Sequence, residues 1–231
     1  MIHLSDFFVE CKKCQNISKP VEYLREDEMI DLQNRCAKIY FRENETIFKQ
    51  GMPATHIAYI KSGLVKVLRT ENNRSFISEI VQHGFFVGLD SLFGSGIHQF
   101  TIICISQCSI CLIDKELLIS FMHKNHEFSY QLLKTSCEDH IKVMTRIMKL
   151  MHKQTPGKIA DLLLFFSNEI FQSLNFEMPI SRNDLAELAG ISKKSIIKIL
   201  QEYKKDGLID LQGKKISIKR IDLLMKLSSA G

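Results

Sequence analysis

The sequence has no apolar run of about 18 residues, the least that a transmembrane helix needs. Its first residues carry Asp6 and Glu10 where a signal peptide needs a basic start and an apolar core. No His-x-His pair occurs, with which the metal ligands of cupin-type enzymes typically begin, and no serine or cysteine has the spacing of a nucleophile elbow. These absences predict a cytoplasmic protein that is not an enzyme and has no membrane partner.

Acidic residues are outnumbered: 26 aspartates and glutamates stand against 31 lysines and arginines, a formal net charge of +5. The excess is concentrated in residues 192–205, where five lysines accompany a single acid, Glu202. Such a run fits a polyanion partner, although a charge run is usually only a solvated face. The 231 residues suffice for one large domain or two modest ones. In a cytoplasmic protein the seven cysteines are expected to be thiols, metal ligands or redox groups rather than structural disulfides.

Residues 181–205 have the pattern of two short helices joined by a tight turn. Ser181 is a good N-cap with Asp184 three residues later, Gly190 can end the helix in the left-handed conformation, and Ser192 can cap the next. The pattern is typical of a helix that enters a DNA major groove, and also of a helical hairpin in a core with solvated lysines. The second helix leaves three lysines on its outer side: Lys193, Lys194 and Lys198.

The segments around this stretch favour the DNA-binding interpretation. Lys158–Leu174 predicts an amphipathic helix before it. Thr155-Pro156-Gly157 is expected to end the long helix that precedes this one and to mark a domain boundary. Leu208–Leu211 and Lys215–Lys219 predict a β-hairpin after it. The order helix, helix, helix, hairpin is that of a winged helix-turn-helix.

Between Ala37 and about Ile113, short runs rich in Ile, Val, Phe and Tyr alternate with turn signals. Two examples are His56–Ile60, before Lys61-Ser62-Gly63, and Phe76–Val81, before His83-Gly84. Many short strands at close spacing predict a jelly-roll or a barrel.

A long helix is expected from about His126 to Lys153. It has two neighbouring apolar stripes, so its apolar face is wider than one seam. One stripe can lie on the β domain and the other on a second copy of the chain; the alternative is that both pack within one subunit. We expect a homodimer, with contacts from Ile141, Met144, Ile147, Met148 and Met151.

In this order of elements the chain resembles the Crp/Fnr transcription regulators over nearly its whole length. Residues 50–67, QGMPATHIAYIKSGLVKV, resemble the family's cyclic-nucleotide-binding-type β roll, and residues 86–96, FVGLDSLFGSG, resemble its ligand loop. Residues 87–90, VGLD, and 94–98, GSGIH, are closer to the Fnr branch than to the cyclic-AMP receptor.

The resemblance implies an α+β fold with four parts: an N-terminal segment (1–20) with a C-x-x-C pair, a cyclic-nucleotide-binding-like β jelly-roll sensor domain (21–124), a dimerisation helix (125–154) and a winged helix-turn-helix (155–231). It implies a homodimer that reads a pseudo-palindromic site in double-stranded DNA, works with RNA polymerase and responds to an effector or redox signal on the β roll. The alternative is a β-roll ligand-binding or cupin-like protein without a role in DNA regulation.

The resemblance also assigns the DNA face. Where Fnr-like proteins carry Glu, Ser and Arg for reading bases, this chain has Lys194, Ile197 and Lys198, so a different half-site is expected. The residues expected to contact DNA are Ser181, Arg182, Ser192, Lys193, Lys194, Ser195, Ile197, Lys198, Lys214 and Lys215.

Nucleotide-binding members of the family place a glutamate on the ribose and an Arg-Ser pair on the cyclic phosphate. Here the glutamate position is Leu89, and the Arg-Ser positions fall at Gln99-Phe100. Because no charge is left there to balance a buried phosphate, we expect no binding of cyclic AMP.

Fnr-type oxygen sensors hold a [4Fe–4S] cluster with four cysteines. Cys11, Cys14 and Cys111 resemble three of these ligands, but the third N-terminal position falls near Pro20, and the fourth ligand is unknown. Cys108 or Cys36 can be weighed as substitutes; on a regular strand Cys108 would face away from Cys111. The alternative is that all of these are plain surface or core thiols. Haem is a further option in the family, but no histidine here has a distinctive spacing.

Overall fold

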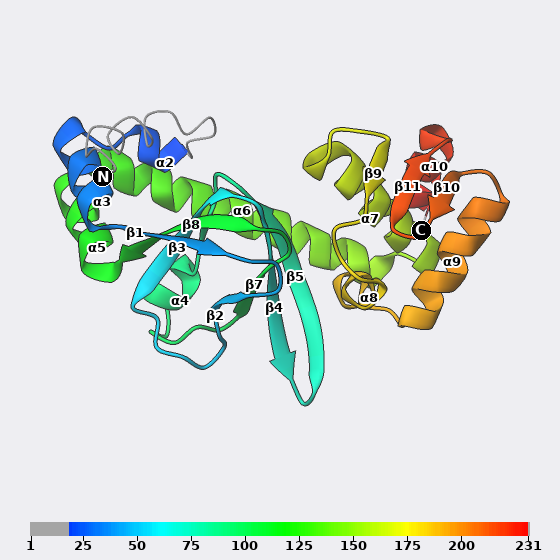
Figure 1. The fold of residues 1–231 in the computed structure, drawn as a ribbon, viewed down its shortest axis with the longest axis horizontal. Coiled ribbons are helices and arrows are strands. Elements are labelled where there is room, and N and C mark those ends of the chain that lie inside the picture. The colour runs from blue at the N-terminus through cyan, green and yellow to red at the C-terminus, as the bar shows by residue number, and fades with distance from the viewer. Residues whose placement is uncertain (1–18, 231) are drawn as a thin grey trace. The chain divides into compact units, whose positions relative to one another are not determined.

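The computed structural model describes residues 19–230, which form two compact units (Figure 1). The first unit contains the described residues up to 70 together with 79–141, and the second contains 71–78 and 142–230. No helix among the described residues is long and apolar enough to cross a membrane.

The first unit is a β roll of two antiparallel sheets, as predicted. In the first sheet the strands run in the order β1 (Ala37–Phe41), β8 (Cys108–Asp114), β3 (His56–Ser62) and β6 (Phe86–Val87). In the second sheet the order is β2 (Thr46–Phe48), β7 (Thr101–Cys104), β4 (Leu64–Glu71) and β5 (Arg74–Gln82).

Two apolar clusters form the core of this unit. One gathers residues from both sheets, among them Ile60 and Ile110 from the first and Val65 and Ile102 from the second. The other packs the opposite face of the first sheet, including Ile57, against helices. This face is covered because side chains alternate along a strand, so β3 and β8 bury apolar residues on both sides.

Three helices supply the other side of the second cluster: α3 (Glu26–Arg35), α5 (Lys115–Lys124) and the start of α6, while α2 (Lys19–Glu22) adds Val21. Asn125 lies between α5 and α6 and is buried. Its amide donates to Glu28 Oε2 at 2.7 Å and to the Tyr23 carbonyl at 2.8 Å, and its Oδ1 accepts from the Phe128 N–H at 3.0 Å. Asn125 therefore both caps α6 and ties it to α3.

The long helix α6 (His126–His152) confirms the predicted one to within a residue at its end. Exposed apolar side chains recur along it at intervals of three and four residues and form a stripe: Tyr130, Leu133, Cys137, Ile141, Met144, Met148 and Met151. Ile147, also predicted as a contact, is half-buried. An apolar stripe of this length exposed on one helix is unusual for a surface that faces only water.

The second unit is a winged helix-turn-helix with additions that the sequence patterns did not predict. The expected elements are α7 (Thr155–Phe165), α8 (Arg182–Ala189), α9 (Lys193–Lys205) and the hairpin β10 (Ile209–Gln212) and β11 (Lys215–Ile218). The additions are a third wing strand, β9 (Asn175–Glu177), a short π-helix, η1 (Phe166–Ile170), and a C-terminal helix, α10 (Ile221–Ala230).

The expected break before α7 is misplaced by a few residues. The prediction left Thr155-Pro156-Gly157 outside any helix, whereas α7 begins at Thr155 with Pro156 in its first turn. Proline suits that position because its missing N–H is unpaired there anyway. The helix predicted to reach Leu174 changes to a π-helix at Phe166 and ends at Ile170.

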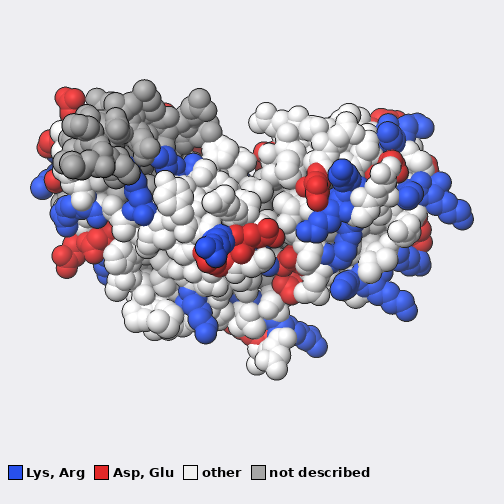
Figure 2. Space-filling view, in the orientation of Figure 1, with Lys and Arg blue, Asp and Glu red and all other residues white. Residues whose placement is uncertain are grey.

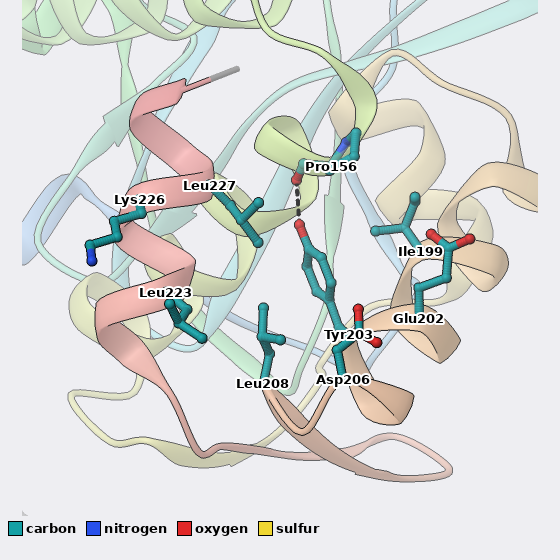
Figure 3. A pocket seen from close by; sticks show the side chains of 9 residues that line it. All are labelled: Pro156, Ile199, Glu202, Tyr203, Asp206, Leu208, Leu223, Lys226 and Leu227. Atoms are coloured by element: carbon teal, nitrogen blue, oxygen red, sulfur yellow. Dashed lines mark hydrogen bonds between the residues drawn. The ribbon is translucent and has the colours of Figure 1, made fainter.

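Helix α9 is hydrogen-bonded to the start of α7 and borders a groove (Figure 3). Tyr203 donates its hydroxyl to the Pro156 carbonyl at 2.7 Å. The groove is mostly apolar, and α10 forms its far side with Leu223, Lys226 and Leu227. The contact fixes the inner face of α9, so the opposite face is turned away from the core.

Candidate DNA interface and sensor site

The helix-turn-helix is built by the capping residues that the sequence indicated. The Asp184 N–H donates to Ser181 Oγ at 3.0 Å and the Ser181 N–H donates to Asp184 Oδ2 at 3.1 Å, a complete capping box at the start of α8. Gly190 ends α8 with φ 63° and ψ 36°, the left-handed conformation that favours glycine. Both predictions are confirmed.

Helix α9 has one buried and one exposed face. Ser192 caps it, its Oγ accepting from the Ser195 N–H at 3.1 Å, and Ser195 itself is half-buried. The buried face consists of Ile196, Ile199, Leu200 and Tyr203. The exposed face carries Lys193, Lys194, Ile197 and Lys198. A short helix with three lysines and one apolar side chain on its free face can lie in a major groove and contact phosphates, base edges and a thymine methyl.

The wing turn adds a second basic region. Gly213 takes a φ of 61°, and Lys214 and Lys215 beside it are exposed. The third strand anchors the hairpin, because Lys215, Ile216 and Ser217 pair with β9. Figure 2 shows lysine and arginine side chains gathered over this unit of the protein.

Arg182, which is predicted to contact phosphate, already has a partner within the protein. It is half-buried, and its Nη2 donates to the Gly213 carbonyl at 2.9 Å. Burial lowers the pKa of its guanidinium, and Nη1 is enclosed without a hydrogen-bond partner among the described residues. Ser181 is exposed, but its hydroxyl is engaged in the capping box. A phosphate contact from either residue stays a prediction.

The ligand-loop region of the β roll lies at the start of the short helix α4 (Leu89–Phe93). Leu89 packs against the helical core cluster and Phe100 against the cluster between the sheets. Gln99 Nε2 donates to Ser95 Oγ at 2.7 Å, and Arg69 Nη1 donates to Gln99 Oε1 at 3.5 Å. A positive charge therefore does lie beside position 99, contrary to the prediction from the sequence, because β4 brings the Arg69 guanidinium to Gln99 from thirty residues away. Position 89 still offers no carboxylate to a ribose, because it is a leucine.

Four of the five cysteines described in the first unit form two pairs. The Cys104 thiol donates to Cys108, which lowers the pKa of Cys108 and raises that of Cys104, and both are buried in the cluster between the sheets. The Cys111 thiol donates to Cys36, which lowers the pKa of Cys36 to about 7, helped by the charges of Lys38 and Lys61 and opposed by burial. Cys108 and Cys111 face opposite sides of β8, as predicted. The pairing of Cys36 with Cys111 was not foreseen.

Of the three cysteines predicted to bind an iron–sulfur cluster, only Cys111 lies among the described residues. Cys11 and Cys14 lie outside the described residues. Within residues 19–230 no three His, Cys, Asp or Glu side chains gather as a metal site. Cys111 is 7% exposed and has the Cys36 thiol beside it. The described residues thus do not by themselves fit a cluster, which needs four ligands.

Comparison with known proteins agrees with this architecture. Residues 38–125 match the cyclic nucleotide-binding domain and residues 157–227 match the Crp-like helix-turn-helix domain. The fumarate nitrate reduction regulatory protein of Klebsiella oxytoca is 24% identical over 227 residues, which cover 95% of this chain and 90% of the relative. The CRP-like cAMP-activated global transcriptional regulator of Mycobacterium tuberculosis is 24% identical over 200 residues, which cover 84% and 89%.

Solved structures share the fold. FixK2 from Bradyrhizobium japonicum has a TM-score of 0.76 at 18% identity, with 85% of this chain and 98% of that chain covered. A transcriptional regulator of the Crp/Fnr family from Eubacterium rectale has a TM-score of 0.77 at 17% identity, with 91% and 98% covered.

A β roll of the cyclic nucleotide-binding type followed by a long helix and a winged helix-turn-helix defines a transcription regulator. This chain belongs to the Crp/Fnr family of such regulators.

Proposed function

We propose that the chain acts as a homodimer that binds a pseudo-palindromic site in double-stranded DNA and whose DNA affinity is set by a signal received on the β roll. The observation that carries this proposal is the exposed face of α9, where Lys193, Lys194, Ile197 and Lys198 stand opposite a fully buried face. A helix held in this way is rigid enough to read base edges while its lysines contact phosphate. RNA polymerase as a further partner rests on the family alone.

The exposed stripe of α6 supports the homodimer. Residues from Tyr130 to Met151 recur at the spacing of a two-helix seam, and Met151 is 75% exposed in the single chain. A second copy of α6 would remove this apolar surface from water. To read two half-sites in successive major grooves, the two copies of α9 in such a dimer need to lie about 34 Å apart.

Selection of DNA from a random pool by the full-length protein tests the proposal. We expect recovery of a sequence with two inverted half-sites, and retention that falls steeply as salt rises. Recovery of no enriched sequence at low salt would leave the alternative of a β-roll protein without a DNA-regulatory role.

The signal is expected not to be cyclic AMP, because Leu89 offers no carboxylate to the ribose. Isothermal titration with cyclic AMP should therefore give no heat of binding at micromolar nucleotide, and micromolar affinity would contradict this expectation. A [4Fe–4S] cluster held by Cys11, Cys14 and Cys111 remains a proposal from the sequence. Iron and sulfide analysis after anaerobic purification tests it.

A further inference from the structure

Two thiols meet at the junction of α3 and β1. Cys36 directly follows α3 and precedes β1, and Cys111 lies in β8, the strand that pairs with β1. In that pairing Lys38 stands opposite Cys111, so Cys36, two residues earlier, lies on the same side of the sheet. Both pack on the helical core cluster, and the Cys111 thiol donates a hydrogen bond to the Cys36 sulfur.

The two thiols differ in access. Cys36 is half-buried, whereas Cys111 is 7% exposed. A small oxidant therefore reaches Cys36 first, and Cys111 is placed to react with the product.

We propose that Cys36 and Cys111 form a reversible dithiol–disulfide pair that responds to hydrogen peroxide and changes the DNA affinity of the protein. In the first step the Cys36 sulfur attacks one peroxide oxygen and the O–O bond breaks; the departing hydroxide takes up the Cys36 thiol proton, so the products are a sulfenic acid and water. In the second step the Cys111 sulfur attacks the Cys36 sulfur, the S–O bond breaks, and the hydroxyl leaves as water with the thiol proton. The sum is two thiols and one peroxide giving one disulfide and two waters.

Closure of the disulfide has a structural consequence. Cys36 and Cys111 are diagonal neighbours, for which a separation of about 7–8 Å is usual, whereas a disulfide needs Cα atoms about 4.4–6.8 Å apart. The bond therefore draws the end of α3 toward β8. Helix α3 also carries Glu28, which holds Asn125 at the cap of α6 with a 2.7 Å hydrogen bond. A shift of α3 thus reaches the start of the helix on which the proposed dimer depends.

Three other cysteines within residues 19–230 provide matched controls. Cys104 and Cys108 also form a hydrogen-bonded pair, but they are 0% and 1% exposed and an oxidant does not reach them. Cys137 is exposed and has no described cysteine partner in its own chain. Among the described cysteines, Cys36 and Cys111 therefore combine a reachable thiol with a second thiol beside it.

This inference rests on the proposed function, and its test separates the two. Full-length protein, treated with a chelator and kept anaerobic, is exposed to equimolar hydrogen peroxide; free thiols are then alkylated and disulfide-linked peptides are identified by mass spectrometry. We expect a Cys36–Cys111 linkage in the wild-type protein and in Cys104→Ser, its removal by dithiothreitol, and its absence from Cys36→Ser. Linkage of other cysteines in its place, or no linkage, would overturn the inference whether or not the protein binds DNA.

The regulatory part is measured on DNA selected by the reduced protein. We expect the affinities of the oxidised and reduced wild-type protein to differ at least fivefold, and that of Cys36→Ser to be unchanged by peroxide. Equal affinities in the presence of the mapped disulfide would overturn the regulatory role. Iron and sulfide that copurify with the wild-type protein and with Cys36→Ser, but not with Cys111→Ser, would assign Cys111 to a cluster and overturn the pair.

Discussion

Arg182 Nη2 donates a hydrogen bond to the Gly213 carbonyl at 2.9 Å and so joins the first helix of the helix-turn-helix to the turn of the wing. The contact spans thirty-one residues of sequence. It makes the position of the wing turn depend on α8, because Lys214 and Lys215 are the next two residues after Gly213. The basic turn of the wing is therefore tied to the helix-turn-helix.

Replacement of Arg182 by glutamine should weaken DNA binding by displacing the wing. Replacement of the exposed Lys214 by glutamine should lower the slope of log affinity against log salt by about 0.9 for one lost phosphate contact. Arg182→Gln should lower the slope as well, because a displaced wing withdraws Lys214 and Lys215 from phosphate. Fluorescence anisotropy over a range of salt concentrations measures the slopes of both variants and of Arg182→Gln in a Lys214→Gln/Lys215→Gln background. A further fall of the slope in that background would make Arg182 itself a phosphate contact.

Lys198→Ala should weaken specific binding by about 1–3 kcal/mol, the usual cost of losing a base contact. Lys198 lies on the exposed face of α9, where Glu202 is 3.8 Å away, a weak surface pair that DNA can displace. The matched control is Lys226→Ala, which removes the same charge from an exposed position on α10 in the same unit. Footprinting on the selected site compares the two variants. Equal affinities of Lys198→Ala and the wild-type protein would show that α9 is not placed in the groove as we infer.

Local signals were sufficient to predict the two helices of residues 181–205 and the turn between them, although not their role. Ser181, Gly190 and Ser192 act on the backbone within three residues of themselves, so their effect can be deduced without knowledge of the fold. The same holds for the alternation that places Cys108 and Cys111 on opposite faces of β8.

The features that the sequence did not reveal depend on distant partners. Arg69 meets Gln99 only because β4 pairs with β7, and Cys36 meets Cys111 only through the register of β1 on β8. The strand β9 has three residues, too few for a periodic signal, and is formed by pairing with β11. The hydrogen bond from Arg182 to Gly213 was not predicted, because it forms only where the wing turn folds back onto α8.

Met148→Glu should disrupt the proposed homodimer. Met148 is 57% exposed in the single chain and lies in the α6 stripe between Met144 and Met151, where a second copy would bury the new carboxylate without a partner. We expect the dimer dissociation constant to rise at least about tenfold, which corresponds to about 1.4 kcal/mol. Thr145→Glu introduces the same charge at an exposed position beside the stripe and should leave the dimer intact. Sedimentation velocity over a dilution series distinguishes these outcomes; equal dissociation constants would remove α6 as the dimer seam.

Glu28 should make the stability of the β roll fall in acid. Burial acts to raise its pKa, but hydrogen bonds from the Arg25 N–H, the Asn125 amide and the Arg25 guanidinium outweigh burial and lower it below the ordinary value of 4.5. A carboxylate whose pKa is lower in the folded state stabilises the protein above the unfolded-state pKa, and this stabilisation is lost as pH falls through the folded-state pKa. The loss should therefore occur below about pH 5, where the unfolded chain begins to take up the proton.

Glu28→Gln tests this dependence. At pH 7 the variant should be less stable by about 1.5–3 kcal/mol, the usual contribution of hydrogen bonds to a charged group. Between pH 5 and about pH 3 its urea midpoint should fall less than that of the wild-type protein, because it has no proton to take up at this position. Asp31→Asn, which neutralises an exposed carboxylate on the same helix, should follow the wild-type curve. If Glu28→Gln and the wild-type protein lost stability in parallel over this range, the Arg25–Glu28–Asn125 network would contribute nothing to the charged form, and the link from α3 to the cap of α6 would rest on packing alone.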